Sequence, residues 1–346
     1  MERRAFVLGG TGFVGRHVSR RLAHSDWDVT VGSRGETDIP SEVKNLRHVT
    51  VDRSMDDSLA AVVANGFDVL VDVIPYEPSD AQQIIDLRDR VGGVIAISTT
   101  SVYADDAGHT MDEAKDEETA PRMPVPILET QRRTEAGCTT YSTKKVAIED
   151  ILLNQNDIPA TVIRPCAIYG PGDTQCREWF FVKRALDGRP IVLLADEGES
   201  VFHTTSVHNL AEMVRLAAEL RVHGAFNCGD PDPPNVRRIA ESIRKVVGHE
   251  WEEVLLPPEV SRDWAVRNPW GGFFPWIVSM AKAHDQLGYK PVTSYEAAIG
   301  EAVEWIVSAT RGRDWRDVLS QGADYLMGKF DYETEDEFLE QVRSSP

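Results

Sequence analysis

The chain has 346 residues, which is enough for one large or two modest domains with a full core. Its 37 Lys and Arg face 56 Asp and Glu, and the net charge of −19 disfavours a surface that grips nucleic acid or anionic lipid. The four cysteines form no C-x-x-C pair, which indicates free thiols in a reducing compartment and no zinc site. The first apolar run starts at Ala5 and none approaches about 18 residues, so we expect no signal peptide, no membrane span and a cytoplasmic protein.

Apolar runs rich in Val and Ile alternate with helix-like stretches in the first half of the chain. The runs predicted as strands are 5–8, 28–32, 46–51, 69–74, 94–98 and 160–164. Nearly continuous apolar character is typical of strands that are buried on both faces of a parallel sheet. We therefore predict an α/β fold with a doubly wound, Rossmann-type parallel sheet, whose ligand crevice lies at the carboxyl ends of the strands.

The second half of the chain is more irregular and more aromatic. We expect a dinucleotide-binding domain over 1–165 and a smaller α/β lobe over 166–346 that binds the substrate. The two should interleave, because part of 200–230 returns to the sheet through a strand-like run at 224–228. A helix is predicted over 296–307 and a frayed acidic tail after Asp331.

The connection over 104–140 is long, acidic and rich in proline. Such a segment is equally consistent with disorder and with an ordered functional flap.

The first strand ends in a glycine-rich turn, with Gly9, Gly12 and Gly15 in G-x-x-G-x-x-G spacing before an amphipathic stretch. The spacing predicts a site for the pyrophosphate of a dinucleotide. The first glycine permits a sharp turn, the second lets the backbone approach a phosphate, and the third lets the helix pack on the strand. The free N–H groups of the helix then face the anion. The predicted contacts include Thr11, Phe13 and Val14, although a glycine-rich turn between any strand and helix looks similar.

Tyr141 and Lys145 lie four residues apart, on one face of a predicted helix. Lys145 is expected to lower the phenol pKa from about 10 toward the working pH, giving a proton donor or acceptor beside a carbonyl or alcohol. Taken alone, the pair favours a surface tyrosine over a lysine stem. Hydroxyls from Ser98 to Ser101 also follow a strand, where they could hold a substrate oxygen or simply cap a turn.

Together these motifs resemble the extended short-chain dehydrogenase/reductase family, which includes nucleotide-sugar epimerases and dehydratases. The resemblance rests on Gly9–Gly15, Ser98-Thr99-x-x-Val102-Tyr103, Tyr141-x-x-x-Lys145, Arg164-Pro165 with Tyr169–Gly172, and Ser206–Ala211. It implies that Thr99 is the catalytic Ser/Thr, Tyr141 the proton-transfer tyrosine and Lys145 the ribose-binding lysine. It also implies a nicotinamide flanked by Pro165 and Ile168, and often a homodimer.

The end of the second strand indicates the cofactor. NAD-selective sites usually present an acidic residue there, whereas this chain has Ser33 and Arg34, which suit a 2′-phosphate. We therefore predict NADP, with NAD possible, unless Arg34 only solvates a turn. Asp52 and Arg53 follow the third strand and resemble the adenine-contacting position of the family, although Asp52 could equally cap the next helix.

Two positions depart from the nucleotide-sugar members of the family. Ala167 replaces an Asn that helps to seat the substrate diphosphate, and Phe202 replaces a phosphate-binding Arg. These changes are closer to the divergent branch that includes the chloroplast stem-loop RNA-binding proteins, yet the acidic charge argues against RNA. The aromatic run over 264–276 suits a planar or hydrophobic substrate, although core packing or a dimer surface is the commoner use of such rings.

The leading hypothesis is an NADP-dependent oxidoreductase that acts on a small, hydrophobic or sugar-like carbonyl or alcohol. Tyr141 transfers the proton, Thr99 bonds the reacting oxygen, and Lys145 holds the ribose and tunes Tyr141. The alternative is a redox-neutral sugar epimerase or dehydratase with a tightly bound dinucleotide. A third hypothesis, from another class, is a cofactor-sensing or RNA-associated protein with a vestigial site.

Overall fold

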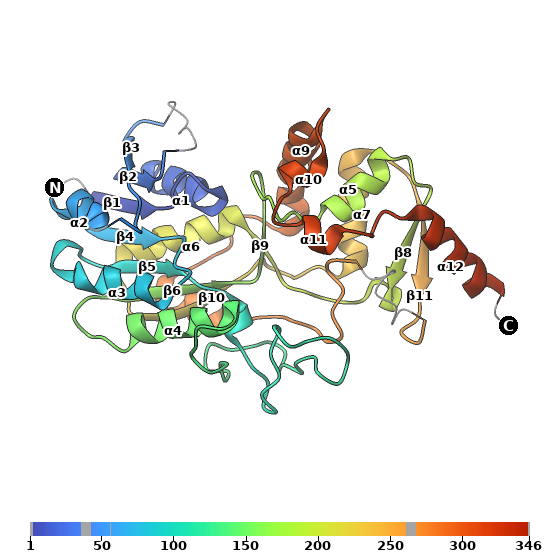
Figure 1. The fold of residues 1–346 in the computed structure, drawn as a ribbon, viewed down its shortest axis with the longest axis horizontal. Helices are drawn as coiled ribbons and strands as arrows, with labels where there is room; N and C mark the ends of the chain where they lie inside the picture. Colours follow the sequence, from blue (N-terminus) through green and yellow to red (C-terminus); the bar gives the residue numbers. More distant parts are fainter. Residues whose placement is uncertain (1–2, 36–42, 56, 261–267, 345–346) are drawn as a thin grey trace. The chain divides into compact units, whose positions relative to one another are not determined.

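The computed structural model describes residues 3–35, 43–55, 57–260 and 268–344, and Figure 1 shows their course. The chain divides into two compact units. The first unit consists of Met1–Cys166, Thr205–Asp230 and Val278–Thr293, and the second of Ala167–Thr204, Pro231–Ile277 and Ser294–Pro346. Each unit is thus assembled from three separate stretches of sequence.

A parallel sheet of seven strands forms the centre of the first unit, in the order β10-β6-β5-β4-β1-β2-β3. The strands are β1 (Arg3–Leu8), β2 (Trp27–Ser33), β3 (Leu46–Thr50), β4 (Val69–Asp72), β5 (Val94–Ile97), β6 (Ala160–Pro165) and β10 (Gly224–Cys228). The strand order reverses between β1 and β4, which creates the switch point where such sheets bind ligands. The predicted doubly wound α/β fold is confirmed.

Helices cover both faces of this sheet (Figure 1). On one face α1 (Phe13–Ala23) packs against α6 (Val207–Leu220), and on the other α3 (Pro78–Asp86) packs against α4 (Tyr141–Leu153). The short helices α2 (Ser58–Val63) and α8 (Ala281–Leu287) complete the unit. Fully buried apolar side chains such as Phe6, Leu70, Ile84 and Val162 join the sheet to its helices.

The second unit is smaller and more aromatic. Its strands β8 (Ile191–Ala195) and β11 (Glu252–Leu256) form a parallel pair. The short strands β7 (Ala167–Tyr169) and β9 (Thr204–Ser206) form a separate pair. Its helices are α5 (Trp179–Leu186), α7 (Val236–Val247), α9 (Tyr295–Thr310), α10 (Trp315–Val318), α11 (Ala323–Leu326) and α12 (Tyr332–Ser344). The helix predicted over 296–307 lies inside α9.

The aromatic run over 264–276 contributes two tryptophans to buried positions, whereas Phe273 and Phe274 are half-buried. Trp270 and Trp276 are only 1% and 3% exposed, and Trp270 belongs to the same buried cluster as Phe181, Trp251 and Tyr295. Trp264 lies outside the described residues. Ordinary packing, the more common use of such rings, therefore accounts for Trp270 and Trp276.

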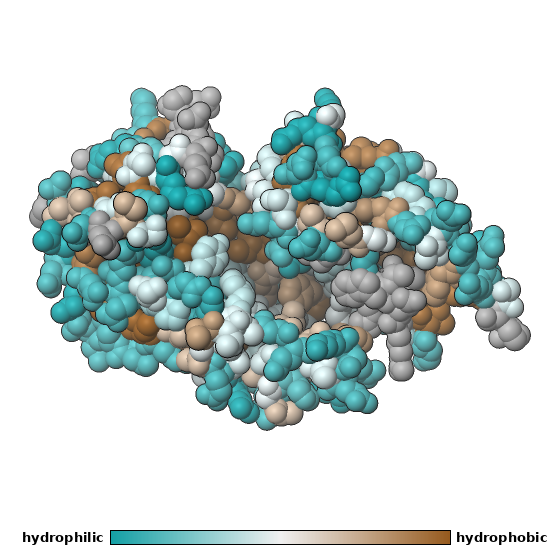
Figure 2. Space-filling view, in the orientation of Figure 1, coloured by the Kyte–Doolittle hydropathy of each residue, from teal (hydrophilic) through white to brown (hydrophobic). Residues whose placement is uncertain are grey.

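The prediction of a frayed acidic tail is wrong. Residues after Asp331 form the helix α12, whose visible face in Figure 2 is mostly hydrophilic. Arg189 makes two hydrogen bonds to Asp336, and Arg184 donates to Glu335 at 3.2 Å. Because both arginines are nearly buried in the second unit, these carboxylates fasten the helix to it.

The long connection over 104–140 has a defined path below α4 in Figure 1. Ala104 N donates to Arg132 O at 2.9 Å, and Thr134 N donates to Val102 O at 2.8 Å. Asp105, which is buried, accepts backbone hydrogen bonds from His109 and Arg122. The segment is therefore an ordered part of the first unit. In the part of the chain that the structure describes, no helix has the length and apolarity that crossing a membrane requires.

Candidate active site

The glycine-rich turn between β1 and α1 depends on missing side chains. Gly9 has a φ of +77°, and a Cβ at Gly15 would lie 2.2 Å from the carbonyl oxygen of Gly9. Both positions therefore require glycine for the turn itself. At Gly12 a Cβ would meet only Gly9 O at 3.4 Å, so packing does not demand glycine there. Because Gly12 has no side chain, the backbone at the start of the helix stays accessible to a ligand.

The N-terminus of α1 carries no internal counter-charge. Gly12 is the N-cap and offers no side-chain hydrogen bond, and the first turn holds no acidic residue. Arg16, one turn later, donates to Thr11 O at 3.0 Å, and burial lowers its pKa. The bare turn and the uncompensated helix dipole fit the pyrophosphate of a dinucleotide.

The carboxyl ends of β2 and β3 bring together groups of both charges. Ser33 Oγ lies 2.7 Å from His48 Nε2, a neighbour that the sequence analysis missed, and Arg34 is exposed beside them. The side-chain and backbone hydrogen bonds from Ser54 lower the pKa of Asp52, and Arg34 adds to the effect. Asp52 does not cap the next helix, because the N-cap of α2 is Asp57.

The guanidinium of Arg53 is hydrogen-bonded to groups of the first unit. It donates to Asp72 Oδ2 at 2.8 Å and to Asp80 O at 3.0 Å, and its side chain is only 13% exposed. Burial raises the pKa of Asp72, while Arg53 opposes this rise. The side chain of Arg53 thus neutralises a fully buried carboxylate at the end of β4, and the predicted adenine contact at this residue stays a prediction.

Tyr141 and Lys145 are positioned by the start of α4. Thr140 caps the helix in a reciprocal capping box with Thr143, so Tyr141 is its first residue. Lys145 Nζ lies 5.5 Å from the Tyr141 ring, one turn away, as the spacing predicts, and 5.3 Å from the ring of Tyr76.

The ammonium group of Lys145 is nearly enclosed. It donates to the carbonyl oxygens of Pro75, at 2.8 Å, and of Ile97, at 2.9 Å, which lie at the ends of β4 and β5. Burial lowers the pKa of Lys145 to about 8, although Asp72 and Glu149 oppose this shift.

The expected lowering of the Tyr141 pKa is not found. Burial raises the pKa of Tyr141 to about 12, with Tyr76 and Asp112 adding to the rise and a hydrogen bond with Thr99 opposing it. Desolvation of the phenol outweighs any help from Lys145, whose ammonium donates to two backbone carbonyls instead. The phenol is therefore protonated at neutral pH.

Thr99 combines the two roles considered for the hydroxyls after β5. It is the N-cap of the short 3-10 helix η2 (Thr100–Val102), because its Oγ1 accepts from Ser101 N at 3.1 Å. The same hydroxyl is hydrogen-bonded to Tyr141 and lies 3.2 Å from Ser101 Oγ. Thr99, Tyr141 and Lys145 therefore meet in one place, beside the ends of β4 and β5.

A buried ion cluster holds α4 in this position. Glu149, fully buried two turns beyond Tyr141, accepts hydrogen bonds from Ser98 at 2.6 Å, from Arg133 at 2.9 Å and twice from Arg164 at 2.6 and 2.9 Å. Burial alone would lower the pKa of Arg164, but the Glu149 carboxylate raises it above the ordinary value. One carboxylate thus joins α4 to β5, β6 and the 104–140 segment.

The positions expected to touch nicotinamide and substrate lie partly in the second unit. Pro165 ends β6 in the first unit, whereas Ile168 is in β7 of the second. Their predicted place beside the nicotinamide stays a prediction. Phe202, which replaces the expected arginine, packs with its ring 6.4 Å from that of Trp276. The guanidinium of Arg177 lies 5.9 Å from the Phe202 ring, so a cation from elsewhere in the second unit occupies this neighbourhood.

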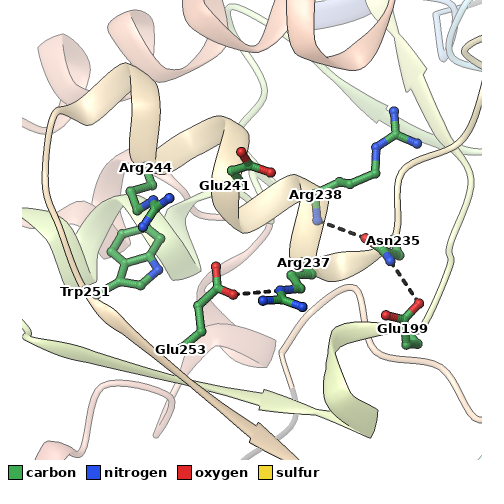
Figure 3. Close-up of a pocket in the computed structure, with 8 residues that line it drawn as sticks. All are labelled: Glu199, Asn235, Arg237, Arg238, Glu241, Arg244, Trp251 and Glu253. Carbon is green, nitrogen blue, oxygen red and sulfur yellow. Dashed lines mark hydrogen bonds and ion pairs between the residues drawn. The ribbon is translucent and has the colours of Figure 1, made fainter.

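The second unit also has an open hollow of about 650 Å³ along α7 (Figure 3). Its lining residues are Glu199, Asn235, Arg237, Arg238, Glu241, Arg244, Trp251 and Glu253. Arg237 donates to Glu253 at 2.8 Å, and the other two arginines pair with Glu296 and Glu250. None of the predicted site residues lines this hollow. Within the described ranges there is also no cluster of His, Cys, Asp and Glu that could hold a metal ion.

Comparison with known proteins supports the class that the fold and these motifs define. Residues 5–229 match the model of the NAD dependent epimerase/dehydratase family, and the chain belongs to that family.

Individual relatives are distant. The chain is 25% identical over 313 residues to the chloroplast stem-loop binding protein of 41 kDa b of Arabidopsis thaliana, covering 84% of this chain and 75% of the relative. It is 24% identical to a probable UDP-glucuronate 4-epimerase of Rhizobium meliloti, with 87% and 96% covered. Among solved structures, dTDP-glucose 4,6-dehydratase of Bacillus anthracis in complex with NAD is similar, with a TM-score of 0.67, 16% identity and 92% and 99% of the two chains covered.

Proposed function

We propose that this protein is an NAD(P)-dependent oxidoreductase that moves a hydride between nicotinamide and a substrate carbonyl or alcohol, with NADP preferred. The observation that carries the proposal is the meeting of Thr99, Tyr141 and Lys145 in the first unit. The glycine turn that fits a dinucleotide belongs to the same sheet edge. Family membership supports a dinucleotide cofactor, and the substrate is proposed to be a small hydrophobic or sugar-like molecule.

The protonation states favour reduction of a carbonyl. With a pKa of about 12, Tyr141 is protonated at neutral pH and is ready to donate to a carbonyl oxygen as negative charge develops there. Thr99 would hydrogen-bond the same oxygen, and Lys145, with a pKa of about 8, remains largely cationic at pH 7 and would hold the ribose hydroxyls. The bound cofactor would supply the hydride.

The cofactor would be held at two places in the first unit. The pyrophosphate would bind the backbone of Gly9, Gly12 and Gly15 with the N–H groups at the start of α1. A 2′-phosphate would bind Ser33 and Arg34, with His48 as a third candidate contact, because these groups offer hydrogen bonds and positive charge. The Asp52 carboxylate beside Arg34 works against this preference.

A second candidate function is a redox-neutral epimerase or dehydratase that acts on a nucleotide-linked sugar. The observation in its favour is Arg177, whose guanidinium lies against Phe202 and 5.6 Å from the ring of Trp270. A phosphate-binding cation could therefore be supplied despite the loss of the expected arginine at position 202.

The test compares the two functions on protein as purified. Mass spectrometry of the denatured supernatant would identify any NAD(H) or NADP(H) that co-purifies. NADPH and NADH oxidation would be followed with 9,10-phenanthrenequinone as a carbonyl probe, and UDP-glucose and UDP-glucuronate would be supplied without added coenzyme. We expect NADPH oxidation with the carbonyl probe. Conversion of a UDP-sugar without coenzyme would favour the epimerase instead.

The variant Tyr141→Phe tests the roles. It should bind NADPH as the wild type does and lose turnover by about 10²-fold or more, the usual contribution of a positioned acid. Retained turnover in this variant would remove Tyr141 from the mechanism.

A further inference from the structure

A continuous chain of hydroxyl groups leads away from Tyr141. Tyr141 is hydrogen-bonded to Thr99, Thr99 Oγ1 lies 3.2 Å from Ser101 Oγ, and Ser101 Oγ lies 3.0 Å from Ser142 Oγ. Ser142 Oγ then donates to Asp112 Oδ1 at 2.8 Å. All five residues belong to the first unit, although they come from η2 and its N-cap, from α4 and from the 104–140 segment.

We propose that this chain is a proton relay and that Asp112 is its solvent end. The inference rests on the proposed function, because it requires that Tyr141 transfers a proton to or from the substrate.

The interior of the hydroxyl chain and its Asp112 end differ in their access to water. The interior link, Ser142, is fully buried, whereas Asp112 is exposed. Ser142 N also donates to Asp112 Oδ2 at 3.3 Å, so both carboxylate oxygens are directed at one residue. An exposed carboxylate held against a buried hydroxyl is suited to pass protons between solvent and the interior.

Tyr141 needs such a path when substrate is bound. Tyr141 is 49% exposed, and a substrate oxygen that accepts its proton would cover the phenol group. The Lys145 ammonium is not part of the hydroxyl chain, because it donates to the backbone carbonyls of Pro75 and Ile97.

The relay balances the reaction in a simple way. During reduction the carbonyl carbon accepts the hydride, the phenol O–H bond of Tyr141 breaks, and its proton goes to the carbonyl oxygen. The tyrosinate takes a proton from Thr99, Thr99 from Ser101, and Ser101 from Ser142. A solvent proton first protonates the Asp112 carboxylate, which then passes it to Ser142, so that one solvent proton is consumed for each carbonyl reduced. Oxidation of an alcohol runs through the same groups in reverse.

Such a path also bears on which function is correct. A redox-neutral epimerase returns its proton within each cycle and has no net exchange with solvent. A relay that opens to water therefore fits net oxidation or reduction.

The test uses the full-length protein, NADPH and 9,10-phenanthrenequinone as the probe. The variants Asp112→Asn and Ser142→Ala interrupt the relay at its end and in its interior, and Ser101→Ala serves as a second interior variant in case Ser142→Ala disturbs the start of α4. Asp106→Asn is the matched control, because it removes an exposed acid from the same segment. Circular dichroism and NADPH binding check that each variant is folded.

We expect Asp112→Asn and the interior variants to lower kcat about tenfold or more, a fraction of the effect of losing a general acid, without changing KM for NADPH. Their solvent deuterium isotope effect on kcat should rise above that of the wild type. Added formate, a small carboxylate, should restore Asp112→Asn but not Ser142→Ala, and Asp106→Asn should match the wild type.

Two results would overturn the relay while leaving the proposed function intact. One is an active wild type with Asp112→Asn equal to Asp106→Asn. The other is a loss of kcat in Asp112→Asn with no formate rescue and no change in the isotope effect, which would mark Asp112 as structural only. If the wild type itself does not oxidise NADPH with the probe, the proposed function fails, and the relay fails with it.

Discussion

The buried carboxylate of Glu149 gives the sharpest prediction about stability. In Glu149→Gln the side chain keeps its shape but loses its charge, while Arg164, only 3% exposed, keeps its own. Removing one partner of a buried ion pair costs about 3 to 5 kcal/mol, because the remaining charge is left uncompensated. Since a folded protein is stable by only about 5 to 15 kcal/mol, this is a large part of the total.

The neighbouring residue provides a matched control. Asp150 also accepts a hydrogen bond from Arg133, at 2.7 Å, but its side chain is 36% exposed. An exposed pair of this kind contributes about 0 to 1 kcal/mol, so Asp150→Asn should be nearly neutral.

Urea unfolding followed by far-UV circular dichroism separates the two variants. With a slope near 3 kcal/mol per molar urea, Glu149→Gln should lower the midpoint by about 1 to 1.7 M, and Asp150→Asn by no more than about 0.3 M. Equal midpoints for the two variants would refute the view that the charge of Glu149 holds α4 in place.

The remaining predictions concern the cofactor, pH and RNA. Gly15→Ala should raise the Kd for NADPH at least about tenfold in a fluorescence titration, since its Cβ would clash with backbone, while Gly300→Ala, with open space around it, should match the wild type. Arg34→Ala should weaken NADPH about tenfold and leave NADH unchanged, and equal losses for both would contradict the 2′-phosphate contact. Burial, aided by Asp173, raises the pKa of Glu178 to about 8, so this group costs stability as pH rises from 4.5 to 8. Glu178→Gln should therefore raise Tm relative to the wild type at pH 8 but not at pH 4.5, and parallel Tm curves would disprove it. Filter binding to a stem-loop RNA at about 150 mM salt should show no retention, because the net charge is −19, and submicromolar binding would contradict that reasoning.

Local spacing predicted what local geometry decides. The glycine turn, the strands of the sheet and the helical pairing of Tyr141 with Lys145 each depend on residues that are close together in the sequence. Glu149 could have been suspected too, since it is an acidic residue among apolar neighbours on the same helix as Tyr141.

Long-range partners were not readable from the sequence. Nothing near Arg53 shows that it neutralises Asp72, and nothing near Asp112 shows that it reaches Ser142. The prediction of a lowered pKa for Tyr141 was wrong for a related reason. Spacing gives the distance to Lys145, whereas desolvation of the phenol depends on the whole surrounding fold. The acidic tail is held as a helix because Glu335 and Asp336 accept hydrogen bonds from arginines that lie roughly 150 residues earlier in the chain.

The place of β10 in the sheet has a consequence for synthesis on the ribosome. Gly224–Cys228 pairs with Thr161–Pro165 of β6. When the first six strands of this sheet have been made, β6 is therefore an unpaired edge until about 60 more residues have been added. At about 5 to 20 residues per second this interval lasts roughly 3 to 12 seconds. During that time β6 presents free N–H and C=O groups flanked by apolar side chains, a template for pairing with another nascent chain. The second unit's first stretch is translated within the same interval, which makes these seconds the period in which chaperone binding would protect the chain most.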